Sequence, residues 1–331
     1  LDDPEIKRVW EEYQADGQAD VMQCLVSGLE EPIARLHPSI KGVRDAQATG
    51  ASLVSFNDRA YESYNRAKGQ GLNSPVSQRV ASGYGVALNY LLSPQNPNRK
   101  IYIGDATVVY WAESPDTRYG NVFAALLNPD YYEEQPADSQ SARREAEEML
   151  GQVAQKVQRG QALDIARLRE GLDANTRFYI LGLAPNAARL SVRFFLQDTF
   201  EKFIERMLSH YHDLQIIKEY PDQPDYISIF RIFNECVSPK ITRREEEIKS
   251  TVSLMGGALT RSILTGAPYP ESLYTAILTR IRIDNDDKDK HVQKINYVRA
   301  AVIKACLLRK YRRQPHNPFQ EVLQMSLNEE F

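Results

Sequence analysis

The order of apolar and polar positions divides the chain into a mixed first part and a helical second part. Short apolar runs predict antiparallel hairpins near residues 21–36, 101–111 and 178–196, and their connectors contain Gly, Pro, Asp or Asn. After Gln197 the strand pattern ends and apolar residues recur at helical spacing. We therefore predict an α+β protein, with a mixed N-terminal half that contains antiparallel hairpins and a mainly helical half after it.

Helices are predicted in both parts. Ser74 is expected to be the N-cap of a helix over residues 76–92, and residues 135–160 have the pattern of an exposed amphipathic helix. The other predicted helices cover residues 4–13, 199–218, 226–237, 242–264, 271–283 and 291–311. A chain of 331 residues exceeds a typical single domain. We expect two domains, residues 1–197 and 198–331.

Composition narrows the class of protein. The hydrophobic fraction of 42% is sufficient for a real core, and 41 basic against 44 acidic residues exclude a uniformly basic DNA-coating protein. The three distant cysteines, Cys24, Cys236 and Cys306, suit buried free thiols in a reducing cytoplasm. No apolar run is long enough to cross a bilayer, so we expect a cytoplasmic protein without a membrane partner. Because the chain begins with Leu1, we expect it to be part of a longer protein.

Basic residues in the first part predict a nucleic-acid surface. They lie around a glycine-containing loop and among Tyr61 and Tyr64. Cationic groups neutralise phosphates, and aromatic rings stack on unpaired bases. A solvated loop with tyrosines in the core is the alternative for this pattern. The predicted residues are Arg35, Lys41, Arg44, Arg59, Arg66 and Lys68.

Two further basic groups are candidates for the same role. Arg189 and Arg193 lie four apart on a predicted strand, so both project from one face of it. Carboxylates from a neighbouring helix are the alternative partners. The end of the last helix is also cationic, which its dipole alone explains equally well. The residues predicted there are Lys304, Arg309, Lys310, Arg312 and Arg313.

The strongest alternative is a metal-dependent nuclease that uses His210, His212 and Asp213. Histidines two apart on a helix point to different faces, so the spacing favours ordinary histidines. The acidic segment 284–289 departs from the calcium-loop pattern, and segment 68–73 departs from the phosphate-loop patterns. We predict a protein that is not an enzyme and has no metal site or cofactor. A purely structural scaffold for partner subunits stays open.

Five segments of the chain resemble segments of a known protein family, and they occur in the same order. They are Cys24–Gly28 with Ile33–Val43, Gly50–Asn57, Gly71–Ser77, Ile103–Glu113 and Ile180–Phe194. Together they resemble the Csd-type large subunit of the subtype I-C CRISPR interference complex, called Cascade. The resemblance runs from about Leu1 to the C-terminus. Full-length family members are longer at both ends, so the chain corresponds to their central part.

The resemblance implies a role in RNA-guided recognition of invading DNA. The implied partners are CRISPR guide RNA, target DNA, other Cascade subunits and a helicase-nuclease recruited in trans. Base pairing with the guide reads the target, while the large subunit recognises the short flanking PAM and helps hold the opened strands. Much of the family's PAM-reading surface precedes the region present here, and its C-terminal bundle follows it. No catalytic residue is implied, because the family's large subunit is not itself a nuclease.

Overall fold

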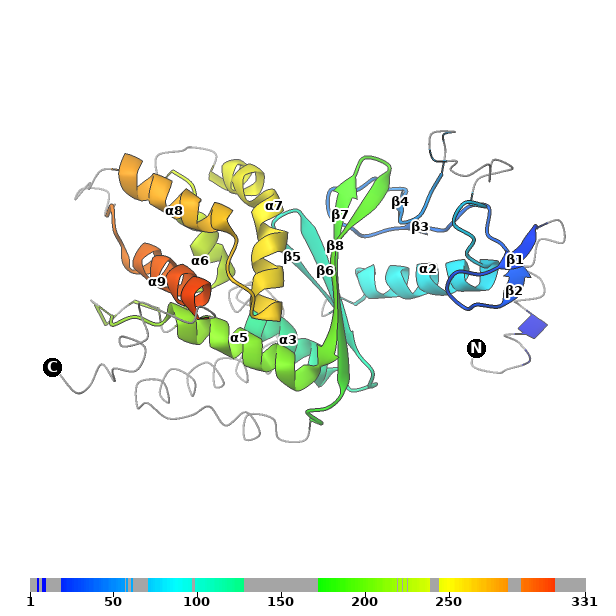
Figure 1. Ribbon diagram of the computed structural model, residues 1–331, viewed down its shortest axis with the longest axis horizontal. Coiled ribbons are helices and arrows are strands. Elements are labelled where there is room, and N and C mark those ends of the chain that lie inside the picture. Colours follow the sequence, from blue (N-terminus) through cyan, green and yellow to red (C-terminus); the bar gives the residue numbers. More distant parts are fainter. Residues whose placement is uncertain are drawn as a thin grey trace. The chain divides into compact units, whose positions relative to one another are not determined.

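The computed structural model describes residues 5, 8–9, 19–56, 58, 61, 71–96, 99–127, 172–218, 220–221, 223–224, 226–238, 244–284 and 293–312 (Figure 1). The chain forms two compact units. Unit 1 comprises Leu1–Lys100 and Leu183–Val192, and unit 2 comprises Ile101–Gly182 and Arg193–Phe331. The predicted domain boundary at residue 197 stays a prediction. Strands and helices together confirm the α+β class.

Unit 1 begins with the first predicted hairpin. Strand β1 (Val21–Gln23) pairs antiparallel with β2 (Glu30–Pro32). Strand β3 (Ser39–Ile40) pairs antiparallel with β4 (Ala51–Ser52), which also pairs with one end of β8, described below. These short ladders place the segments on either side of them next to each other.

Helix α2 (Gln78–Leu92) lies in unit 1, and its start corrects the prediction. The N-cap is Ser77 and not Ser74, because the Ser77 hydroxyl accepts a hydrogen bond from the Val80 amide at 3.3 Å. Ser77 also forms an isolated bridge with Ile33. Ser77 itself is extended, with φ of −63° and ψ of 152°, so the helix begins after it.

Strands β7 (Arg177–Asn186) and β8 (Arg189–Thr199) form the predicted hairpin at 178–196. Its turn lies at Ala187–Ala188. Ala187 has a φ of +52°, a conformation that is uncommon for a residue with a Cβ atom. Leu183–Val192 of this hairpin belongs to unit 1, and the remainder belongs to unit 2.

In unit 2 the strands are hydrogen-bonded in the order β8-β7-β6-β5. Strands β5 (Lys100–Ile103) and β6 (Ala106–Ala112) confirm the predicted hairpin at 101–111. Gly104 in their turn has a φ of +61°, and a Cβ atom there would lie 2.8 Å from the Ser253 carbonyl oxygen. The turn therefore approaches the backbone of a neighbouring helix at a distance that requires glycine.

The helices of unit 2 form one hydrophobic core together with these strands. Helix α3 (Arg118–Leu127) was not predicted; its residues from Tyr119 to Leu127 are buried on nearly every side. The five helices predicted after residue 197 are confirmed. Four of them lie within the predicted ranges, and the helix predicted over residues 242–264 ends one residue later than expected. They are α5 (Phe200–Leu214), α6 (Ile229–Asn234), α7 (Arg244–Thr265), α8 (Glu271–Ile283) and α9 (Tyr297–Tyr311).

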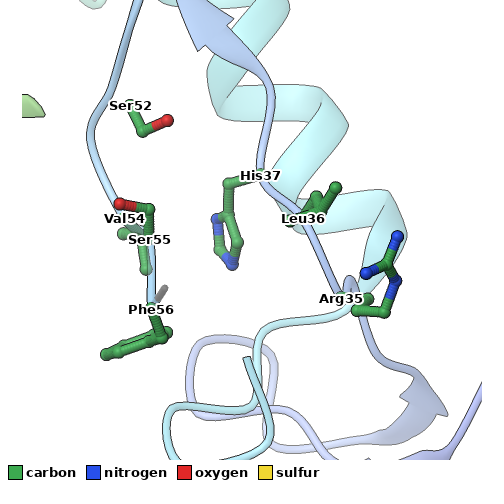
Figure 2. Close-up of a pocket in the computed structure, with 7 residues that line it drawn as sticks. All are labelled: Arg35, Leu36, His37, Ser52, Val54, Ser55 and Phe56. Atoms are coloured by element: carbon green, nitrogen blue, oxygen red, sulfur yellow. The ribbon is translucent and has the colours of Figure 1, made fainter. Parts of the chain in front are cut away.

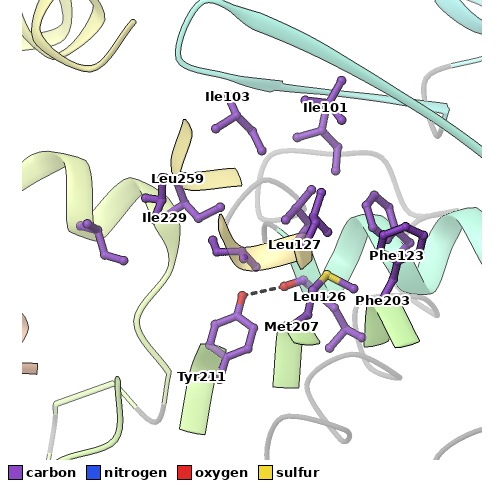
Figure 3. Close-up of a cluster of buried hydrophobic side chains, with 14 of the residues drawn as sticks. Ile101, Ile103, Phe123, Leu126, Leu127, Phe203, Met207, Tyr211, Ile229 and Leu259 are labelled. Carbon is purple, nitrogen blue, oxygen red and sulfur yellow. Dashed lines mark hydrogen bonds between the residues drawn. The ribbon is translucent and has the colours of Figure 1, made fainter. Parts of the chain in front are cut away.

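The core of unit 2 joins α3, α5 and the strands. Phe123, Leu126 and Phe203 are buried in it, and the Tyr211 hydroxyl donates a hydrogen bond of 2.6 Å to the Leu126 carbonyl oxygen (Figure 3). This bond satisfies a buried polar group and fixes α5 against the end of α3. The amphipathic helix predicted over residues 135–160 lies outside the described residues. None of the helices that are described is long and apolar enough to span a membrane.

Candidate nucleic-acid interface

Unit 1 contains a pocket between the segments 35–37 and 52–56. The β3–β4 ladder pairs Ser39 with Ser52 and so holds the chain segments on either side close together. Figure 2 shows the His37 ring between the two segments. The pocket combines hydroxyl groups, an imidazole and an aromatic ring with an exposed arginine. Its lining residues are Arg35, Leu36, His37, Ser52, Val54, Ser55 and Phe56.

Arg189 of β8 lies beside this pocket in unit 1. Its backbone pairs with Ser52, and its Nε donates a hydrogen bond of 2.9 Å to the Ser55 hydroxyl. Its Nη1 donates to the Tyr61 hydroxyl at 2.9 Å, and the guanidinium lies 4.7 Å from the centroid of the Tyr61 ring. These contacts orient the guanidinium through neutral groups. Arg35 lines the pocket and Arg189 binds one of its lining residues, although the two arginines were predicted from distant parts of the sequence.

His37 contributes a polar wall to the pocket. Its Nδ1 lies 2.6 Å from the Tyr84 hydroxyl of α2, and its Nε2 is buried without a hydrogen-bond partner among the described residues. Burial lowers the pKa of His37, so the ring is uncharged at neutral pH. The imidazole can therefore exchange hydrogen bonds with a ligand but does not neutralise a phosphate there.

Lys41 and Arg44 lie in the exposed loop after β3. The Lys41 amide donates to the Asn89 side-chain oxygen at 2.8 Å, which fixes the start of the loop to α2. The Arg44 Nε lies 3.9 Å from the Asp45 carboxylate, and both side chains are largely exposed. Both predicted cations thus lie on the surface of unit 1, where a phosphate can reach them.

Arg193 has an acidic partner in unit 2. Its guanidinium forms an ion pair with Asp105 in the β5–β6 turn. The Arg193 side chain is 30% exposed. A carboxylate therefore neutralises the charge of Arg193. The alternative stated for this residue was a carboxylate from a neighbouring helix, whereas Asp105 lies in a turn.

At the end of α9, Arg309 is sealed inside unit 2. Its Nε donates to Asp213 at 2.8 Å, and its Nη1 donates to the carbonyl oxygens of Ser262 and Ala267 at 2.9 and 3.2 Å. The Arg309 side chain is only 1% exposed, and Arg312 binds the second oxygen of the same carboxylate. Burial removes Arg309 from the residues that can reach a phosphate without opening this core.

His210 and Asp213, two of the three residues proposed for a metal-dependent nuclease, are buried and bind other side chains of unit 2. His210 is buried with its Nδ1 2.5 Å from the Tyr269 hydroxyl, whereas His212 is exposed. Burial raises the pKa of Asp213, but hydrogen bonds from His212 and Arg309 outweigh it and lower this pKa to about 2. Asp213 therefore serves as the permanent counter-charge of the buried arginine.

The remaining predicted cations have different surroundings. The Lys304 ammonium donates to the Gln215 carbonyl oxygen, and burial lowers the pKa of Lys304. Lys310 is exposed and nearly half of the Arg312 side chain is exposed, so both stay accessible at this end of α9. Four predicted residues lie outside the described part of the chain, namely Arg59, Arg66, Lys68 and Arg313.

No group of His, Cys, Asp and Glu that could hold a metal ion occurs among the described residues. Asp284, where the calcium-loop candidate begins, is buried and binds Arg280 and Arg299 at 2.7 and 2.8 Å. The three cysteines are free and buried, as the sequence predicted. Burial raises the pKa values of Cys236 and Cys306 to about 12, which makes both thiols unreactive at neutral pH.

Sequence reasoning missed the neutral residues that surround the basic ones. Ser55 and Tyr84 position Arg189 and His37, but nothing in their local pattern distinguishes them from other polar residues. In unit 2 the sequence did contain a usable pattern. Side chains alternate between the two faces of a strand, and this alternation places aromatic residues of β6, β7 and β8 on the face opposite the core.

This geometry is that of an α+β protein with arginines and neutral hydrogen-bonding groups around a surface pocket. A family model described as CRISPR-associated protein (Cas_Csd1) matches residues 1–331. The chain therefore belongs to the Csd1 family of CRISPR-associated proteins, and the resemblance seen in the sequence is confirmed. No curated protein matches the chain.

Proposed function

We propose that this chain acts as the non-catalytic large subunit of a type I-C CRISPR surveillance complex. In that role it contributes to recognition of target DNA beside a PAM, binds DNA strands and joins the other Cascade subunits around the guide RNA. The observation that carries this proposal is the match of the Csd1 family over residues 1–331. A helicase-nuclease recruited in trans would then cut the target.

The pocket of unit 1 is the proposed place of contact with a sugar-phosphate backbone. Guanidinium groups bind phosphate oxygens through two parallel hydrogen bonds. Ser55 and Tyr61 carry no charge and position the partly exposed Arg189 guanidinium beside the pocket. Arg35 lines the same pocket and is exposed. Lys41 and Arg44 extend this cationic surface along the loop after β3.

The direct test uses the assembled complex with a PAM-containing target duplex. The logarithm of the binding constant falls linearly with the logarithm of the salt concentration. Removing one contact to a phosphate makes this slope shallower by about 0.9. The double variant Arg35→Ala/Arg189→Ala should therefore bind more weakly, with a slope lower by about 2. Arg282→Ala, an exposed arginine of α8, is the matched control. If the double variant keeps the affinity and slope of the control, these two arginines do not contact the nucleic acid.

The subunit role itself has a separate test. The chain, co-expressed with guide RNA and the backbone subunits, should co-purify with them in one complex. A chain that stays outside the complex would contradict the role, whatever its own affinity for DNA.

The non-catalytic character is tested with the isolated chain, DNA or RNA substrates and manganese. We expect no cleavage, because Asp213 is held by Arg309 and Arg312. Cleavage that disappears in His212→Ala would instead establish a nuclease.

A further inference from the structure

Three aromatic side chains of unit 2 form one cluster on neighbouring strands. Trp111 of β6 and Tyr179 of β7 have ring centroids 5.3 Å apart and planes only 11° apart. Phe195 of β8 lies 6.5 Å from Tyr179 and 6.4 Å from Trp111, with interplanar angles of 20° and 31°. The Trp111 and Tyr179 rings are therefore stacked face against face, and the Phe195 ring lies nearly parallel to Tyr179. We call these three rings the aromatic platform.

The platform lies on the face of the strands opposite the core. Its sequence neighbours Tyr110, Phe178 and Phe194 are buried in the hydrophobic core. Successive side chains of a strand point to opposite faces, so Trp111, Tyr179 and Phe195 point away from that core. Phe195 is 53% exposed, whereas Tyr110 and Phe178 are completely buried. Core packing therefore does not account for the platform.

The surroundings of the platform favour a nucleic-acid strand over an apolar partner. Arg177, two residues before Tyr179 on β7, lies on the same face and is exposed. Arg193, two residues before Phe195 on β8, is partly exposed beside its partner Asp105. Stacked rings with the exposed Arg177 on the same face match the alternation of bases and phosphates in a single strand.

We propose that Trp111, Tyr179 and Phe195 form a stacking platform for unpaired bases of single-stranded nucleic acid. Every base has a π face, so such a platform binds strands with little sequence preference. Arg177 would bind the phosphate next to a stacked base. This inference rests on the proposed function, because an opened target duplex supplies the unpaired strand, and it assigns that strand to residues outside the pocket of unit 1.

The decisive experiment measures binding of fluorescein-labelled oligothymidine to the full 331-residue chain. The chain has two tryptophans, Trp10 and Trp111, so a Trp10→Phe variant reports on Trp111 alone. We expect saturable quenching of this tryptophan, because bases stacked on an indole ring quench its emission. Phe195→Ala should weaken binding by about 5- to 150-fold, the range for removal of one stacking residue.

Phe230→Ala is the matched control, since Phe230 is another exposed phenylalanine of unit 2, on α6 and 40% exposed. Arg177→Gln should lower the salt slope for the single strand by about 0.7. Absence of quenching, or equal affinities of Phe195→Ala and Phe230→Ala, would overturn the platform. Quenching by a purified Cascade subunit and not by oligothymidine would identify a protein surface instead.

Failure of the platform and failure of the proposed function give different results. If only the platform is wrong, the wild-type complex still binds its PAM-containing duplex and that binding still depends on Arg35 and Arg189. If the proposed function is wrong, the chain does not enter the complex, even where oligothymidine quenches Trp111.

Discussion

Arg189 in unit 1 and Arg309 in unit 2 show how differently the same side chain is used in this protein. Arg189 is partly exposed and contacts the neutral hydroxyls of Ser55 and Tyr61. Arg309 is buried and contacts the carboxylate of Asp213, which is itself fully buried. The first arrangement orients a positive charge at the surface, whereas the second neutralises a charge inside the core.

The reason for the difference is the cost of removing a charge from water. A guanidinium in the interior of a protein loses its hydration and is tolerated only with a counter-charge and several hydrogen bonds. Arg309 has both, because two backbone carbonyl oxygens and one carboxylate oxygen accept its hydrogens. Arg189 is partly exposed, so water still hydrates its guanidinium. A basic residue is therefore a candidate for phosphate binding only where its surroundings leave it accessible.

The largest expected effect comes from removing the buried counter-charge. Asp213→Asn leaves Arg309 charged and buried, and we expect a decrease of about 3–5 kcal/mol in the free energy of unfolding. Urea denaturation followed by circular dichroism measures it. Arg312→Ala is the control, because this side chain is 44% exposed and its removal should cost about 1 kcal/mol or less. Equal decreases in both variants would mean that the Arg309 pair contributes no more than a surface pair.

The second prediction uses pH to probe the same core. Burial, followed by the positive charge of Arg309, lowers the pKa of His210 to about 3, while the charge of Asp213 opposes this change. The unfolded chain has an ordinary histidine pKa near 6.5. Between these values the unfolded state binds the additional proton, so stability should fall by about 1.4 kcal/mol for each pH unit below about 6.5.

Urea midpoints at pH 7 and pH 5 measure this dependence. His210→Gln removes the titrating group while it retains an amide that can bond to Tyr269. The variant should lose less stability than the wild type between the two pH values. An identical decrease in both proteins would show that His210 is not held neutral in the folded state.

Much of the fold could be predicted because its elements have strong local patterns. The hairpins near 101–111 and 178–196 have β-branched and aromatic runs on both sides of a turn, and α8 was predicted with both ends correct. Helix α3 escaped prediction because it is buried on nearly all sides. The start of α2 was wrong because a bridge between Ile33 and Ser77, distant in sequence, decides it.

The candidate site could be predicted only in part, since it depends on contacts between distant segments. The sequence named Arg35 and Arg189 separately, but only the folded chain places Arg35 in the lining of a pocket whose Ser55 binds Arg189. From the sequence, Arg309 and Arg189 were both predicted to bind nucleic acid. The carboxylate of Asp213 lies 96 residues before Arg309 along the chain, and no local pattern reveals such a pair.

The third prediction separates the charge of Arg189 from its geometry. Arg189→Lys keeps the charge but removes the fork that joins Ser55 and Tyr61, so we expect weaker target binding with an unchanged salt slope. Arg189→Ala should lower that slope by about 0.9 as well. Affinity measurements on the assembled complex at several salt concentrations distinguish them. Both variants should change the free energy of unfolding by less than about 1 kcal/mol, in contrast to Asp213→Asn.

The smallest effect is expected at the exposed pair of Arg44 and Asp45. Their 3.9 Å separation and high exposure predict a change within about 0.5 kcal/mol in the free energy of unfolding for Asp45→Asn. Asn also tolerates the φ of +62° at this position, so the backbone is not strained by the substitution. The same variant removes a negative charge beside a proposed phosphate contact, so target binding should become slightly tighter at low salt. A decrease of several kcal/mol in urea denaturation would show instead that this surface pair resembles the sealed pair of unit 2, and the contrast between the two regions would fail.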